Sequence, residues 1–171
     1  MIARTLLAGL IGLAACGYTS RPGHGQARVS GGALPALAVL PFDNATFRRG
    51  LEIRLTRLVA DEWRSRGART PAPVSSADWI LKGTIVRAEE RVYSEDRDDR
   101  IRESSIIVTV DVVLEERASG EVLGTNSFVE RAPFSTRAGR IASVEQAQEE
   151  ALRDLAEQIV YWLESRKAKT S

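Results

Sequence analysis

The chain has 171 residues, of which 43% are hydrophobic and 27% are charged, and its formal net charge is +1. This composition predicts one globular domain and shows no excess of charge that would indicate binding to nucleic acid. The single cysteine, Cys16, and the single histidine, His24, exclude an intramolecular disulfide and any mechanism that needs a cluster of these residues. We expect no cofactor.

The amino terminus has the features of a signal peptide. One positive charge, Arg4, precedes the apolar run 6–15, and Cys16 follows directly. The run is too short to cross a bilayer as a helix, but it has the length of a signal-peptide core. Leu13-Ala14-Ala15-Cys16 resembles the bacterial lipobox, whose cysteine is acylated, typically with palmitate, and becomes the mature N-terminus. We therefore predict a signal peptide over residues 1–15 and lipid attachment at Cys16.

An ordinary secretory signal followed by an incidental cysteine is the alternative. The residue after Cys16 is Gly17 and not aspartate, which in the lipoproteins that this terminus resembles favours export to the outer membrane. Residues 16–35 contain five glycines and two prolines and predict a flexible tether, in which His24 is solvated. This leaves residues 36–166 for a folded domain and residues 167–171 for a disordered tail.

The domain opens with a strand and a helix. The apolar run 37–42 predicts a short buried strand, and Asp43-Asn44 supplies turn chemistry. An apolar stripe then predicts an amphipathic helix over residues 50–66, with Gly67 placed to end it in the left-handed conformation. The residues of the stripe are Leu51, Leu55, Leu58, Val59 and Trp63.

Three strands are expected next. Residues 79–87 predict a strand in which Gly83 marks a possible bulge. Strict alternation over 101–116 predicts a strand with one buried and one wet face. The buried set is Ile106, Val108, Val110, Val112 and Leu114, and the wet set is Thr109, Asp111 and Glu115. Ser119-Gly120 indicates a tight turn, after which residues 121–131 form the returning strand.

A second long helix ends the chain. Ser143 and Gln146 have the spacing of a capping box, and an apolar stripe continues from Val144 to Leu163. The order β-α-β-β-β-α predicts an α+β two-layer sandwich: a four-stranded sheet with two helices on one face and a polar open face. Trp63 and Trp162 are expected in the core or at its rim, whereas Trp79 is a candidate for facing a partner.

With these elements in place, the chain resembles the lipopolysaccharide-assembly lipoproteins called LptE. The matching blocks, in order, are Cys16-Gly17-Tyr18, Val39-Leu40-Pro41-Phe42-Asp43-Asn44-Ala45-Thr46-Phe47, Arg49-Gly50-Leu51-Glu52, Leu55-Thr56-Arg57-Leu58-Val59-Ala60-Asp61-Glu62, Ala77-Asp78-Trp79-Ile80-Leu81-Lys82-Gly83-Thr84-Ile85, Val108-Thr109-Val110-Asp111-Val112 and Ser119-Gly120-Glu121-Val122-Leu123. Residues 88–103 show no pattern that aligns. The resemblance implies an LptE-like domain over residues 36–166, lodged in a large outer-membrane β-barrel, LptD, and aiding lipopolysaccharide insertion.

The charged stretch 89–103 contains seven acids and four arginines. The simpler interpretation is a solvated hairpin tip. The functional interpretation is that Arg97, Arg100 and Arg102 contact phosphates of lipopolysaccharide or polar groups inside a barrel, because guanidinium groups suit phosphate geometry. Neighbouring carboxylates on a loop do not give the fixed separation across a cleft that hydrolases need, so we expect no enzyme. No zinc-ligand spacing occurs either.

A lipoprotein of another class is the competing hypothesis, either an activator of a cell-wall synthase or a component like those of curli secretion. Domains of these classes also open with a strand of the type Val39-Leu40-Pro41-Phe42. Synthase activators usually have a long Pro-rich tether, however, and the tether here is short. Secretion pores need extra hairpins, for which the domain has little room.

Overall fold

The computed structural model describes residues 34–67, 71–95, 101–135 and 140–170. Cys16, His24, Arg97 and Arg100 lie outside these ranges. Arg102 lies in a described strand, but its side chain is outside the description, as are those of residues 93–95, 101–103, 135, 140–143 and 167–170. Acylation of Cys16, the tether and the arginine contacts therefore stay predictions.

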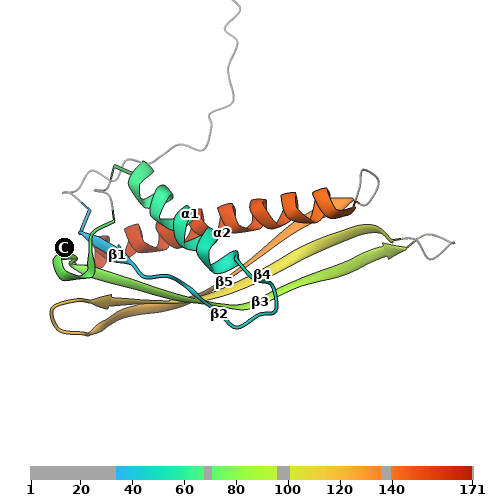
Figure 1. Cartoon of the computed structure of the whole chain (residues 1–171). Helices are drawn as coiled ribbons and strands as arrows, with labels where there is room; N and C mark the ends of the chain where they lie inside the picture. The colour runs from blue at the N-terminus through green and yellow to red at the C-terminus, as the bar shows by residue number, and fades with distance from the viewer. Residues whose placement is uncertain (1–33, 68–70, 96–100, 136–139, 171) are drawn as a thin grey trace, which may run out of the picture. The chain divides into compact units, whose positions relative to one another are not determined.

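The described chain forms two layers, a sheet and two helices that cover one of its faces (Figure 1). The expected fold class and the order β-α-β-β-β-α are confirmed, with the first strand divided into two short pieces. The elements are β1 (Leu37–Val39), β2 (Asp43–Asn44), α1 (Leu51–Ser65), the 3₁₀ helix η1 (Val74–Ser76), β3 (Trp79–Glu95), β4 (Ile101–Glu116), β5 (Val122–Ser135) and α2 (Arg140–Thr170).

The sheet has the order β1-β3-β4-β5, and β2 also pairs with β3. β1 and β2 run parallel to β3, while β3, β4 and β5 form an antiparallel meander. The first strand is divided at Pro41, which has no N–H to donate to the ladder. The N–H of Phe42 instead donates to Oγ1 of Thr56 on α1 at 3.0 Å, so the division also ties the edge of the sheet to the helix layer.

The predicted bulge at Gly83 is wrong. Gly83 pairs with Val112 without interruption, and the first of three breaks in the β3–β4 register lies between Ile85 and Arg87, where Val86 is the extra residue. Glycine is needed at position 83 for packing, because a Cβ there would lie 2.7 Å from Cε2 of Phe42. The glycine marks a close approach of a side chain, which is the other common reason for glycine inside a strand.

The core lies between the sheet and the helices, and the predicted alternation of β4 is confirmed. Trp63 is fully buried and Trp162 lies at the rim, as expected. Trp79 is also buried in the core, so its interpretation as a partner-facing residue is wrong. Among the described residues, all core side chains lie between Leu37 and Leu163. They all belong to the compact unit Gly32–Ser171, so we expect this unit to fold on its own.

Helix ends differ from the sequence pattern more than helix centres do. Gly67 has φ +81°, which confirms its left-handed role after α1. α2 begins at Arg140, so Ser143 lies inside the helix and the predicted capping box is wrong. α2 also continues to Thr170, and the assignment of these last residues to a disordered tail is corrected accordingly. Residues 164–169 contain no glycine or proline, and cations near the C-terminus suit the helix dipole.

Candidate functional site

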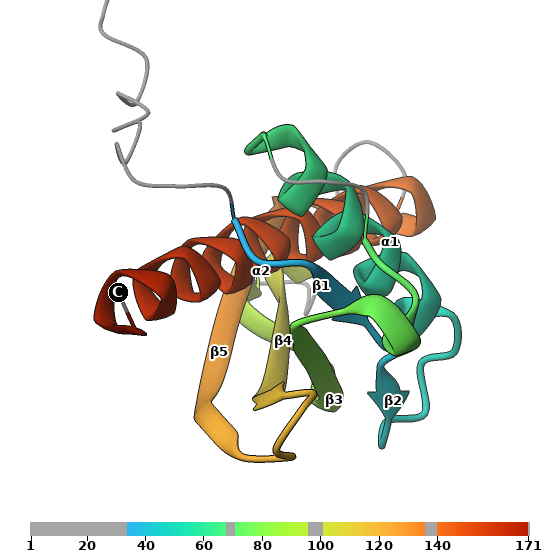
Figure 2. The same ribbon diagram turned by 90° about the vertical axis from the view of Figure 1, so that its left-hand side faces the viewer.

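The face of the sheet opposite the helices is the first candidate surface (Figure 2). The predicted wet set of β4 is confirmed: Asp111 is exposed, and Thr109 and Glu115 are half-buried. The register places side chains of β3 and β5 beside them, and we call the whole set the open face. It consists of Lys82, Thr84, Arg87, Glu89, Arg91, Ser105, Ile107, Thr109, Asp111, Val113, Glu115, Thr125, Ser127, Val129 and Arg131.

Charges on the open face are arranged in pairs. Nζ of Lys82 lies 2.7 Å from Oε1 of Glu115. Oε1 of Glu89 lies 2.6 Å from Nη2 of Arg87 and 3.9 Å from Nη2 of Arg91. Exposed pairs of this kind stabilise a fold by about 0–1 kcal/mol each. Because the acids offset the arginines, the open face fits a polar protein surface better than a simple anion.

One apolar side chain is buried on the open face, which the sequence analysis missed. Ile107 is only 4% exposed although no helix covers it. Its cross-strand neighbours are Glu89 and Arg131, and long charged side chains cover apolar surface with their aliphatic stems. The run Ile106-Ile107-Val108 breaks the alternation of β4 and is the signal that would have revealed this residue.

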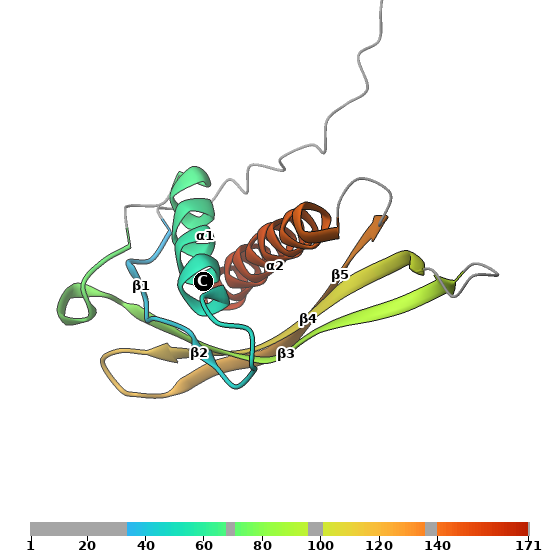
Figure 3. The same cartoon turned by 45° about the vertical axis from the view of Figure 1, so that its right-hand side comes forward.

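The β3–β4 hairpin is longer than expected. The third strand was expected to end at residue 87, but β3 continues to Glu95. β4 begins at Ile101, as the alternation predicted. Strands that are solvated on both faces accept charged residues, so polarity did not argue against a strand here. The two strands extend past the beginning of α2 (Figure 3). The pairing of β3 with β4 therefore continues as far as Glu95 and Ile101, next to the tip of the hairpin.

A second candidate surface lies where the chain passes from β2 to α1. The side chain of Asn44 donates from Nδ2 to the carbonyl oxygen of Arg48 and to Oε2 of Glu52, both at 2.7 Å. Its Oδ1 accepts from the N–H and the hydroxyl of Thr46, at 2.9 and 2.7 Å. The sequence indicated only a turn at Asn44; the spacing to Glu52, eight residues later, gave no signal of this contact.

Glu52 is held ionised by this arrangement. A hydrogen bond from its own backbone N–H and the one from Asn44 lower the pKa of its carboxyl below the usual range. The carboxylate is thus fixed at the first turn of α1, where a negative charge suits the helix dipole. The side chain of Asn44 thus joins the two ends of the loop that runs from Asn44 to Glu52.

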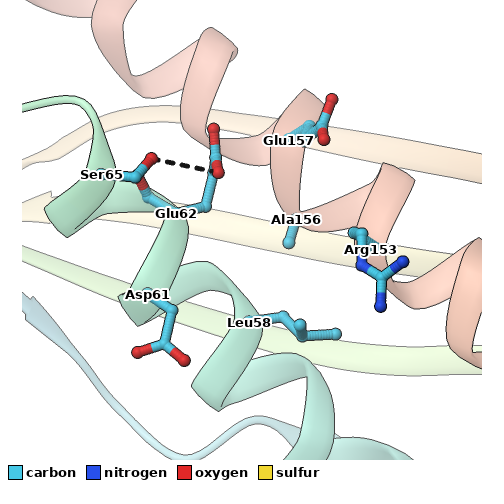
Figure 4. A pocket seen from close by; sticks show the side chains of 7 residues that line it. All are labelled: Leu58, Asp61, Glu62, Ser65, Arg153, Ala156 and Glu157. Atoms are coloured by element: carbon cyan, nitrogen blue, oxygen red, sulfur yellow. Dashed lines mark hydrogen bonds between the residues drawn. The ribbon is translucent and has the colours of Figure 1, made fainter.

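An open groove of about 270 Å³ lies between α1 and α2. Figure 4 shows Ser65 hydrogen-bonded to Glu62 at one end of the groove and Arg153 at the other. Nε of Arg66 lies 2.6 Å from Oε1 of Glu62, and this hydrogen bond raises the pKa of the guanidinium. Glu62 is therefore engaged in structure and is not positioned as a general base.

Within residues 34–67, 71–95, 101–135 and 140–170, no three His, Cys, Asp or Glu side chains gather in a way that could hold a metal ion. No helix in these ranges has the length and apolar character needed to cross a membrane.

A small two-layer domain with an uncovered polar sheet face fits a binding protein. The family model for lipopolysaccharide assembly, LptE, matches residues 34–163. The chain therefore belongs to the LptE family, a non-enzymatic family of lipoproteins that act in lipopolysaccharide assembly. The family resemblance found in the sequence is confirmed.

Solved structures show the same fold at low sequence identity. Protein XCC0632 from Xanthomonas campestris is 15% identical with a TM-score of 0.67, over 81% of this chain and 88% of that one. A proposed lipoprotein from Caulobacter crescentus CB15 is 16% identical with a TM-score of 0.56, over 80% and 93%. A PelC dodecamer from Paraburkholderia phytofirmans is 18% identical with a TM-score of 0.51, over 78% and 94%. None of the curated protein sequences matches the chain.

Proposed function

We propose that the protein is an outer-membrane lipoprotein, anchored on the periplasmic side through acylated Cys16, that partners an LptD-type β-barrel and assists lipopolysaccharide assembly. The observation that carries this proposal is the family match over residues 34–163. The lipobox-like ending at Cys16 supports the lipid anchor. A single acyl chain holds a protein only marginally at a membrane, so a multiply acylated cysteine is expected.

In this proposal, the open face and the β3–β4 hairpin contact the barrel. The lumen of an outer-membrane barrel is polar, which suits the paired charges Lys82–Glu115 and Arg87–Glu89. Arg97, Arg100 and Arg102, at or beside the tip of the hairpin, are proposed to meet phosphates of lipopolysaccharide. The protein has no catalytic step of its own in this scheme.

Purification of the full-length protein from its native membranes tests the proposal. The mature protein should lack residues 1–15, carry lipid on Cys16 and retain a large β-barrel in a fixed ratio. The variant Cys16→Ala should be processed poorly and should not remain with the membrane. Recovery of a peptidoglycan synthase, or of a homo-oligomeric ring without a barrel, would instead support the competing classes of lipoprotein.

A further inference from the structure

The loop between β2 and α1 exposes an aromatic side chain completely. Phe47 is 104% exposed, more than any other large hydrophobic side chain of the described residues. Figure 2 shows the loop arching away from the sheet before it enters α1. Ile53, in the first part of α1, is also exposed, at 57%. Two large apolar side chains thus face water around the point where the chain enters the helix.

The loop that holds Phe47 is fixed by hydrogen bonds. Asn44 bonds to Thr46 before Phe47 and to the carbonyl of Arg48 after it. The N–H of Arg48 donates to Oγ1 of Thr46 at 3.2 Å, and Gly50 closes the loop with φ +86°. These contacts determine the backbone on both sides of Phe47. The hydrogen bonds therefore hold the ring in an exposed position, where it does not pack against the rest of the domain.

Three arginines lie in the same stretch of the chain as Phe47, two in the loop and one on α1. Arg49 and Arg57 are exposed, and Arg48 is half-buried. Among the described residues, no carboxylate forms an ion pair within 4.0 Å of Arg48, Arg49 or Arg57. The nearby acid Glu52 accepts a hydrogen bond from Asn44, and the charge of Arg49 adds a smaller lowering of the pKa of its carboxyl. We call the set Phe47, Arg48, Arg49, Ile53 and Arg57 the Phe47 knob.

The knob has the chemistry of a contact with a protein. A fluid bilayer does not need a loop of fixed shape, whereas a pocket in a folded partner does. The three cations are arginines, as are 21 of the 24 Lys and Arg residues of the chain. The planar guanidinium has the advantage at carboxylates that accept two parallel hydrogen bonds. Aromatic and arginine side chains also dominate the binding energy of protein interfaces.

We propose that the Phe47 knob anchors the protein to its membrane-protein partner, which supplies an apolar pocket for Phe47 with carboxylates at its rim. This inference rests on the proposed function and names a surface of the chain separate from the open face and the hairpin tip. The knob contributes the apolar anchor of the interface, and the open face contributes its polar area.

The test measures binding of the full-length lipoprotein to the LptD-type barrel of the same organism, both purified in detergent. Phe47→Ala should weaken the affinity at least tenfold, which corresponds to about 1.4 kcal/mol. Arg49→Glu with Arg57→Glu should weaken it similarly and should reduce its dependence on salt. Matched controls on α2, Tyr161→Ala at a side chain 69% exposed and Arg153→Glu, should stay within twofold of the parent. Thermal unfolding should not change in Phe47→Ala, because the ring packs against nothing.

The outcomes separate the knob from the proposed function. If the parent binds the barrel and Phe47→Ala binds equally well, the knob is overturned and the proposed function stands. If the parent does not bind the barrel, both are overturned. A third experiment measures binding of the fragment Gly32–Ser171 to vesicles of phosphatidylglycerol. Binding to vesicles that Phe47→Ala abolishes, with unchanged affinity for the barrel, would assign the knob to a lipid surface instead.

Discussion

The ring of Phe42 occupies the space above Gly83 on the neighbouring strand, and a Cβ at position 83 would lie 2.7 to 2.9 Å from three of its ring carbons. Gly83→Ala should therefore destabilise the domain by about 1–3 kcal/mol, the usual cost of overpacking a core. Urea denaturation measures the loss. Phe42→Leu, which shortens the side chain, should recover part of it in the double variant. Equal stability of Gly83→Ala and the parent would show that the ring moves freely.

Periodicity in the sequence predicted the elements that bury one continuous stripe. The stripes of α1 and α2 and the alternation of β4 each depend on neighbours within one element, so they can be recognised locally. The role of Gly83 could not be recognised locally, because Phe42 lies about forty residues earlier, between β1 and β2. The hydrogen bond from Asn44 to Glu52 could not be recognised locally either, because it forms only when the first turn of α1 brings Glu52 close to Asn44.

The hairpin was underestimated for a different reason. Charged residues on both faces of β3 beyond Arg87 give no apolar alternation, and the strand is held instead by its pairing with β4. Its continuation to Glu95 is a property of the partner strand and not of its own composition. The side chains of Arg97, Arg100 and Arg102, by contrast, remain known only from the sequence.

Asn44→Ala should loosen the loop that carries Phe47 and should destabilise the domain by about 1–2 kcal/mol, since it removes the partners of several polar groups. The stability difference should depend on pH. The pKa of Glu52 is lowered in the folded state, so its contribution is complete above the usual pKa of a glutamate and is lost as the pH falls through the folded value. Thermal unfolding of both proteins between neutral and acid pH measures this. A constant difference would contradict the role of Glu52.

Asp154→Asn should stabilise the domain at neutral pH. Asp154 is exposed on α2, but partial loss of hydration, and then the charges of Glu130, Glu157 and Glu150, raise the pKa of its carboxyl. A raised acid pKa means that the ionised form is unfavourable in the folded state. The gain should be a few tenths of a kcal/mol at neutral pH, as for other like-charge contacts, and should vanish as the pH falls below the usual range of an aspartate.

The matched control for Asp154→Asn makes the same chemical change on the open face. Asp111→Asn removes an exposed carboxylate on the open face, so its stability at neutral pH should stay within about 0.5 kcal/mol of that of the parent. A gain in Asp111→Asn equal to that in Asp154→Asn would point to the net charge of the chain as the cause, and not to the carboxylates around α2.

Ile107→Ala should be costly although it lies on the open face. The side chain is 4% exposed, and truncating a buried isoleucine to alanine costs about 2–5 kcal/mol. Val129→Ala, on the same face but 59% exposed, should change stability by less than about 0.5 kcal/mol. Urea denaturation of the two variants side by side provides the comparison. Similar small losses in both would mean that the charged side chains do not cover Ile107 in solution.

The triple variant Arg97→Ala, Arg100→Ala and Arg102→Ala tests the proposed role of the hairpin tip. Each arginine–phosphate contact at a partly desolvated site contributes about 1.5–3 kcal/mol, and a tenfold change in affinity is about 1.4 kcal/mol. Loss of three contacts should therefore weaken binding of lipopolysaccharide well over tenfold.

A second triple variant serves as its control and removes three exposed arginines of the helices, Arg54, Arg64 and Arg153. Its charge is the same as that of the hairpin variant, so nonspecific attraction to an anionic lipid should fall equally in both. Binding is measured to purified lipopolysaccharide and to the barrel, with thermal unfolding in parallel. A loss confined to the hairpin variant would support contact at the tip. Parental affinity of the hairpin variant for both ligands would make the tip a solvated turn, because charges that only face water contribute nothing to either complex.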